Sequence, residues 1–213
     1  MQVIGLAYDP TTNSVLLFDR SANKVYSMNA LTGVTTVLFS TPGVQLQGGA
    51  VLNDVVYAIN EGTQKLVAYS KTGTLLSTAT LAYPSHLHNL GLIPGTGELF
   101  TINGSNGAAI MNPNGTPGLQ LLSSSQTGGI SPEDVDYFNG SFLVAKYENS
   151  LTLMNSTTGS TSTFLTSTQL SSIGVTGSVS GVAVQTNAVP EPATWAMLAA
   201  GGLLWGIRRR RQG

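Results

Sequence analysis

A unit of about 42 residues repeats along most of this chain, and the repeat restricts the folds open to it. Each unit contains short apolar runs and one glycine within a polar turn. These glycines are spaced by 40, 42 and 44 residues: Gly33, Gly73, Gly115 and Gly159. Glycine suits such a turn because a tight hairpin needs a residue with a positive φ angle. A period this regular argues against a β-sandwich.

Each unit is expected to hold four strands, with a hairpin in the middle and one further strand on either side. The first strands are expected at 3–8, 47–52, 89–93 and 135–138, and the fourth strands at 35–39, 74–80, 119–122 and 162–165. Four strands in about 42 residues is the pattern of a propeller blade. We therefore predict an all-β fold, a β-propeller of about four four-stranded blades plus one extra strand at 179–184.

Residues 1–188 are assigned to this propeller-like repeat region. The repeats are placed at 3–43, 44–85, 86–129 and 130–173, with a partial repeat at 174–186. Three arrangements stay open: an incomplete part of a larger ring, four blades that close on themselves, or a fragment that does not fold alone because an open ring exposes strand edges.

Residues 18–26 show the repeat most clearly, because a strand ends in Asp19 and a short polar loop leads through Lys24 into the next strand. This pattern of a strand, an acidic or amide residue, a polar loop, a lysine, a strand and a glycine turn resembles NHL-like or related propellers. The resemblance spans residues 3–184.

Charge is scarce and unevenly placed. Charged residues make up 9% of the chain, against about 25% in ordinary soluble domains. Four of the nine basic residues are the consecutive arginines 208–211, whereas residues 1–189 hold five basic and nine acidic side chains. Nucleic-acid binding needs clustered lysine and arginine, so this balance excludes it. The absence of cysteine excludes disulfides, thiolate metal sites and cysteine nucleophiles.

The last 25 residues have three parts in a fixed order. A proline-rich stretch comes first: Pro190, Glu191 and Pro192. An uncharged apolar run, 193–207, follows, and then a basic cluster: Arg208, Arg209, Arg210 and Arg211. As a helix the run would be about 22 Å long, against a hydrocarbon core of about 30 Å. Tryptophans near both ends suit the membrane interfaces, and arginines stay on the cytoplasmic side. We therefore predict a C-terminal transmembrane helix.

This three-part order over residues 189–213 resembles the PEP-CTERM sorting signal. The resemblance implies recognition by exosortase, a membrane-embedded cysteine protease of Gram-negative bacteria, and cleavage near Pro190–Pro192. It also implies release of the repeat region toward the cell surface or an exopolysaccharide matrix. The alternative is an ordinary single-span anchor with its positive charges inside.

Proteins with this signal carry an N-terminal secretion signal, whereas residues 1–9 already follow the pattern of a strand. We therefore expect that either an N-terminal segment is missing from this chain or another export route is used, and the first of these is favoured.

A propeller gathers two sets of loops on one face around its central channel, where ligands usually bind. The loops that lead into the innermost strands hold Gln45, Gln47, His86, His88, Asn89, Glu133 and Asp134. The loops between second and third strands hold Asp19, Arg20, Asn60, Glu61, Asn103, Asn106, Tyr147 and Glu148. His86 and His88 share one side of an extended chain and are spaced for a metal, which Glu133 or Asp134 could complete. The alternative is a polar loop with two solvated histidines. Asp136 is expected to face a neighbouring blade or the channel.

Phosphate-binding loops, metalloprotease helices and nucleophile elbows have no counterpart in this sequence. The sequence therefore predicts an exported, non-catalytic surface or matrix protein without a cofactor. Its expected partners are exosortase, the inner membrane, and an exopolysaccharide or another surface protein. The alternative is a metal-dependent lactonase, lyase or other hydrolase with its site near His86, His88 and Glu133.

Overall fold

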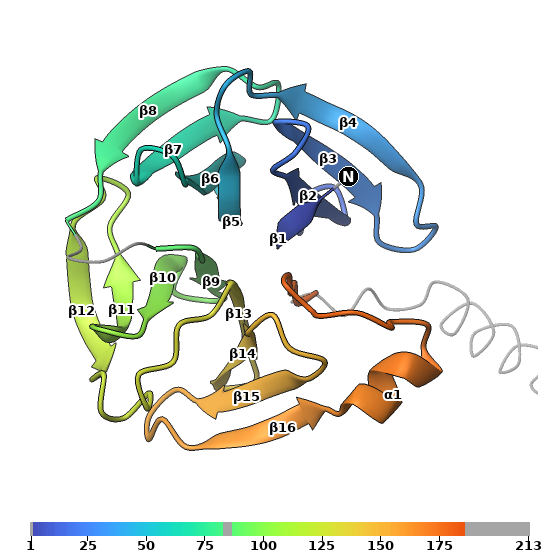
Figure 1. Cartoon of the computed structure of the whole chain (residues 1–213). Helices are drawn as coiled ribbons and strands as arrows, with labels where there is room; N and C mark the ends of the chain where they lie inside the picture. The colour runs from blue at the N-terminus through green and yellow to red at the C-terminus, as the bar shows by residue number, and fades with distance from the viewer. Residues whose placement is uncertain (1, 83–86, 186–213) are drawn as a thin grey trace, which may run out of the picture.

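The computed structural model describes residues 2–82 and 87–185, which form four four-stranded antiparallel sheets arranged as blades around one centre (Figure 1). Blade 1 is β1 (Val3–Asp9), β2 (Ser14–Asp19), β3 (Lys24–Asn29) and β4 (Thr35–Ser40); blade 2 is β5 (Leu46–Leu52), β6 (Val55–Asn60), β7 (Lys65–Ser70) and β8 (Leu75–Thr80). Blade 3 is β9 (Gly91–Ile93), β10 (Glu98–Asn103), β11 (Gly107–Met111) and β12 (Pro117–Leu122); blade 4 is β13 (Asp134–Phe138), β14 (Ser141–Ala145), β15 (Leu151–Asn155) and β16 (Thr161–Leu165). The predicted propeller is confirmed.

Within each blade the strands lie in chain order, and the first strand is innermost (Figure 1). The four turn glycines have φ angles of 70°, 84°, 82° and 76°, as the spacing predicted. Two-residue turns with positive φ, at Asn53–Asp54 and Asn139–Gly140, join the first two strands of blades 2 and 4. Such turns match the twist of antiparallel strands, so they fix the hairpin register.

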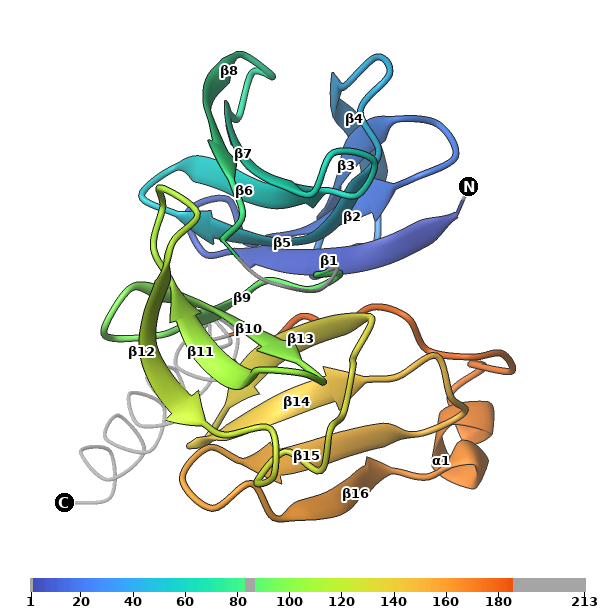
Figure 2. The ribbon, with the colours of Figure 1, turned by 60° about the vertical axis from the view of Figure 1, so that its left-hand side comes forward.

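The hydrophobic core is divided among the spaces between successive blades. Phe18 and Val56 belong to the cluster between blades 1 and 2, and Leu66 and Leu99 to the cluster between blades 2 and 3. Between blades 3 and 4, Phe100 and Phe142 are fully buried and their rings stack with centroids 4.8 Å apart. Figure 2 shows the inner strands of all four blades meeting between the two pairs of blades.

The inner strands approach each other closely, and glycine makes this possible. A Cβ atom at Gly49 would lie 2.2 Å from Cζ of Phe18, and one at Gly91 would lie 2.4 Å from Cε1 of Phe100. Gly5 on β1 is similarly close to its neighbour, because a Cβ there would lie 2.7 Å from the backbone nitrogen of Gly48 on β5.

The ring closes between blades 4 and 1 through residues 179–185, which we call the closing segment. It lies between β13 and β1, as Figure 1 shows in red. Val179 forms one isolated antiparallel bridge with Glu148, and the hydroxyl of Ser180 donates to the carbonyl oxygen of Val3 at 3.2 Å. β1 contacts both β5 and β13.

The extra strand predicted at 179–184 is therefore an extended segment with a single bridge rather than a strand. The physical reason is that carboxylate side chains, and not the backbone of a neighbouring strand, accept the N–H groups of Val182 and Val184. A short helix, α1 (Ser167–Ser172), precedes the segment and was not predicted. Its signal is a capping box in which the side chains of Thr166 and Gln169 bond reciprocally to backbone N–H groups.

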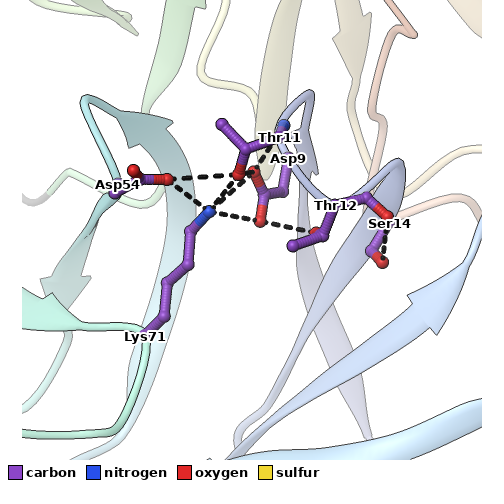
Figure 3. A network of polar contacts seen from close by, with 6 residues as sticks. All are labelled: Asp9, Thr11, Thr12, Ser14, Asp54 and Lys71. Atoms are coloured by element: carbon purple, nitrogen blue, oxygen red, sulfur yellow. Dashed lines mark hydrogen bonds and ion pairs between the residues drawn. The ribbon is translucent and has the colours of Figure 1, made fainter.

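An ionic cluster joins blades 1 and 2 away from the core (Figure 3). Nζ of Lys71 lies 2.8 Å from Oδ2 of Asp9 and 2.6 Å from Oδ1 of Asp54, and it also contacts Thr11. Asp9 is only 2% exposed. Burial raises the pKa of Asp9, but hydrogen bonds from Lys71, Thr12 and Thr11 outweigh it, so the pKa is lowered.

The Lys71→Met variant is expected to lower the free energy of unfolding by about 1–3 kcal/mol, because it leaves the buried Asp9 carboxylate without a cation. Chemical denaturation at pH 7 measures the change. Lys146→Met is the matched control, since its partner Glu148 is 55% exposed and such surface pairs contribute about 1 kcal/mol or less. Equal losses in the two variants would contradict a structural role for the Lys71 cluster.

Candidate functional site

The residues predicted to surround the channel mouth lie on the side of the ring where the inner strands begin, which we call the start face. Here Nδ1 of His88 lies 2.9 Å from Oε1 of Gln47, a hydrogen bond that links blades 3 and 2. Gln47 is 2% exposed. His88 is therefore held by a neutral amide, and its partner is a buried side chain of the neighbouring blade.

Asn89 is a structural residue. Its amide nitrogen donates to the carbonyl oxygens of Ile102 and Pro132, at 2.9 and 3.0 Å, and its Oδ1 accepts from the N–H of Ile102. The residue is 1% exposed, so this arrangement satisfies its polar atoms within the protein. It ties the start of blade 3 to the loop that enters blade 4.

The loops between second and third strands also pair across blades. Nε of Arg20 lies 2.9 Å from Oε2 of Glu61, which joins blades 1 and 2. Asp19 accepts hydrogen bonds from Gln2, Ser21 and Ala22, and these outweigh the effect of burial, so its pKa is lowered. The remaining predicted residues of these loops range from buried to exposed: Asn60, Asn103, Asn106, Tyr147 and Glu148. Gln45 is exposed, and its backbone accepts from Glu61.

The predicted metal ligands are only partly placed by the structure. His86 lies outside the described residues, and Glu133 is half-buried beside β13. Asp134 is fully buried and its Oδ2 accepts from Leu6 of β1 instead. Within 2–82 and 87–185, no group of three or more histidines and acids could hold a metal ion. The metal hypothesis therefore stays a prediction that depends on His86.

Two buried carboxylates, which we call the acid pair, lie on β13 where the ring closes. Oδ2 of Asp134 accepts from the N–H of Leu6 and of Val182, both at 2.9 Å. Oδ2 of Asp136 accepts from the N–H of Val184 at 2.6 Å. The acid pair therefore connects blade 4 to blade 1 and to the closing segment. Asp136 faces the closing segment, whereas the sequence predicted that it would face a neighbouring blade or the channel.

Burial dominates the ionisation of the acid pair. It raises the pKa of Asp134 well above its usual value, and it raises the pKa of Asp136 to about 7, although backbone N–H groups oppose both effects. Oδ1 of Asp134 is buried with no hydrogen-bond partner in the described part of the chain. A buried carboxylate without a cation is costly, so these two groups favour the protonated form.

Two cavities adjoin the closing segment on the opposite side of the ring, where the inner strands end, and the first of them also adjoins Asp136. One measures about 30 Å³ and is lined by Tyr8, Pro10, Asp136 and Val184 among others, which is room for a single water molecule. The other measures about 260 Å³ and lies between Pro94, Tyr137, Asn139 and Gln185. Sequence reasoning placed the channel site on the start face and missed these cavities. The available signal was Asp136, an acidic residue inside the apolar innermost strand predicted at 135–138.

The predicted sorting residues 190–192 and 208–211, with the apolar run 193–207, lie outside the described residues. Among the residues that the structure does describe, no helix is both long and apolar enough to cross a membrane.

Comparison with protein families gives one match, to the PEP-CTERM protein-sorting motif at residues 188–211. No curated protein matches the chain in sequence. The matched residues contain every part of the predicted signal, from the proline-rich stretch to the arginine cluster.

Solved structures share the fold at low identity. The Nidogen/Laminin complex is 16% identical over 85% of this chain and 84% of that one, with a TM-score of 0.51. A protein of unknown function from Bacteroides thetaiotaomicron is 20% identical over 78% and 44% of the two chains, with a TM-score of 0.52. A streptogramin B lyase structure is 17% identical over 76% of this chain, with a TM-score of 0.48, and this chain spans 54% of its length. The similarity to the first two of these structures concerns the fold alone. The chain is a four-bladed β-propeller that carries a PEP-CTERM protein-sorting motif at residues 188–211.

Proposed function

We propose that this protein is a surface or extracellular-matrix-associated protein that exosortase processes at its C-terminal signal, and whose propeller is a non-catalytic binding or structural scaffold. The observation that carries the proposal is the sorting motif at 188–211, which implies export to the cell envelope and surface. The apolar run at 193–207 is the membrane segment, and the arginines hold its end on the cytoplasmic side. Cleavage near Pro190–Pro192 then frees the propeller from the membrane.

The blade arrangement supports a scaffold role. On the start face, paired side chains link neighbouring blades, as Gln47 does with His88 and Arg20 with Glu61. These pairs use the polar groups of the face to hold blades together. An exopolysaccharide or another surface protein is the partner that such an exported scaffold would bind.

Changing the four arginines 208–211 to serine is expected to block processing while leaving synthesis intact. The full chain, placed behind a bacterial secretion signal, is expressed in an exosortase-positive host and followed by immunoblot. The original chain should yield the shorter product, and the serine variant should accumulate at full length. Lys24→Ser is the matched control, because it also removes positive charge but lies in blade 1. A serine variant processed at the original rate would overturn exosortase sorting.

His88→Ala is expected to leave the metal content of the purified full-length protein unchanged, because His88 already bonds to Gln47 and a scaffold needs no metal. Elemental analysis after dialysis against zinc or manganese measures the content, with Gln45→Ala on the same face as control. A stoichiometric metal that disappears only in His88→Ala would contradict the scaffold role and favour a metal-dependent enzyme.

A further inference from the structure

The closing segment is the last described part of the chain before the sorting motif, so what holds it decides where the motif is attached. Its N–H groups at Val182 and Val184 bond to the two carboxylates of the acid pair. Val182 is 4% exposed and packs in an apolar cluster with Leu143 and Leu151 of blade 4. The segment is thus bound by alternate backbone groups and by apolar side chains, as an extended peptide is bound at the edge of a sheet.

Both neighbouring blades contribute to this docking. On blade 4, the N–H of Val179 donates to the carbonyl oxygen of Glu148 at 2.9 Å. On blade 1, Val3 accepts from Ser180, and a Cβ at Gly181 would lie 2.9 Å from Cγ of Leu6. Docking therefore requires both ends of the ring to be in place, and a propeller that has not closed offers only half of the site.

Docking also has an energetic cost, because two carboxylates are buried where the segment docks. Asp134 and Asp136 are both buried, and Oδ1 of Asp134 has no partner among the described residues. No ion pair of the described residues involves either carboxylate. A docked segment that buries two uncompensated acids is held less firmly than a paired strand would be.

The position of the last docked residue limits the distance between the folded propeller and the sorting motif. Pro190 is five positions beyond Gln185, a span of at most about 18 Å at 3.3–3.6 Å per residue. The start of the apolar run at 193 is eight positions beyond Gln185, a span of at most about 29 Å. When the segment is released, the nearest residue still bonded to the propeller is Val175, whose N–H donates to the carbonyl oxygen of Leu170 in α1. The maximal distance between the propeller and the sorting motif then grows by about 35 Å.

We infer that the cleft between blades 4 and 1 is a docking site for the closing segment, and that docking slows proteolytic processing by holding the cleavage site close against the folded propeller. This inference rests on the proposed function. A membrane-embedded protease must bind the stretch at 190–192, and a propeller held within about 29 Å of the membrane segment leaves it less room to do so. Release of the segment removes that crowding.

One variant releases the segment and another locks it. Val182→Asp places a third acid in the apolar cluster beside the acid pair, so it should release the segment. Glu148→Cys with Val179→Cys joins two residues that face each other in an antiparallel bridge, where Cα separations of about 4.5–5.5 Å suit a disulfide. The chain has no other cysteine, so this disulfide forms without competition. Ser162→Asp, on the exposed strand β16, is the matched control for an added charge.

Pulse-chase processing in the exosortase-positive host, with hydrogen exchange at Val182 and Val184 in purified protein, tests the inference. We expect processing at least about threefold faster for Val182→Asp, about threefold slower for the oxidised double cysteine variant, and the original rate after its reduction. Rates equal to the original, with exchange showing the segment released or locked, would overturn the inference alone. If exchange shows the segment undocked in the original chain, the docking site itself is refuted. Failure of the original chain to be processed would instead overturn the proposed function.

Discussion

Truncating Phe142 to alanine is expected to lower the free energy of unfolding by about 3–5 kcal/mol. Phe142 is fully buried on β14, its ring stacks on Phe100 of blade 3, and Tyr137 contacts it edge-on with centroids 5.9 Å apart. The change removes a large apolar surface and leaves a cavity between two blades that cannot collapse without moving a whole sheet.

Chemical denaturation, followed by circular dichroism, measures this loss. Phe164→Ala on the outermost strand of blade 4 is the matched control, because Phe164 is 36% exposed and its ring contacts that of Phe138. Its expected cost is about 1 kcal/mol or less. If the two variants lost equal stability, the blade 3–blade 4 interface would not be a main source of stability.

Periodicity predicted most of the fold because each blade is a local unit. The turn glycines mark hairpins, and strands such as β6 and β14 are apolar on both faces since both faces pack against other blades. These features depend on residues close together in sequence, so a pattern of 42 residues reveals them. The sorting motif was predictable for the same reason, because its three parts are contiguous and their order is chemically specific.

Contacts between blades were beyond the reach of the sequence pattern. Lys71 and Asp9 are 62 positions apart, and His88 and Gln47 are 41 apart, so no local spacing announces either pair. Periodicity placed His88 and Asp134 on one face, but it could not show that Asp134 bonds to Leu6, 128 positions away. The sequence of the closing segment follows the strand pattern of the repeats. Only the structure shows that its backbone N–H groups bond to carboxylate side chains rather than to the backbone of a neighbouring strand.

Asp136 illustrates a signal that was present but not used. The innermost strands of blades 1, 2 and 3 each contain glycine, whereas β13 of blade 4 contains none and carries Asp136 instead. An acid on a crowded inner strand requires space and hydrogen-bond donors, and the closing segment supplies the donor at Val184. Asp136 therefore marks the place where blade 4 meets the closing segment.

The acid pair predicts an unusual dependence of stability on pH. Because the pKa of Asp136 rises from an ordinary value of 3.8 to about 7 on folding, the folded state binds more protons than the unfolded state between these pH values. Stability therefore increases as pH falls from about 7 toward about 4, by roughly 4 kcal/mol from Asp136 alone. The raised pKa of Asp134 acts in the same direction. Below about pH 4 the lowered pKa values of Asp9 and Asp19 reverse the trend, so stability should be greatest on the acidic side of neutrality.

Thermal and chemical unfolding between pH 8 and pH 3 measure this curve. Asp136→Asn removes one titrating group and keeps an oxygen that can accept from Val184, so it should flatten the rise between pH 7 and pH 4 and stabilise the protein at pH 8. Asp54→Asn is the control, because hydrogen bonds from Lys71 and Thr11 lower the pKa of Asp54, and its loss should leave that rise intact. Other titratable groups on the elements around the acid pair are Tyr8, Glu133, Tyr137, Lys146 and Glu148, and none of them forms an ion pair with it in the described residues. If the free energy of unfolding of the original protein did not change between pH 8 and pH 5, the two carboxylates of the acid pair would not be buried without a compensating charge. Docking of the closing segment would then lack the energetic cost of burying them, which is what makes docking reversible.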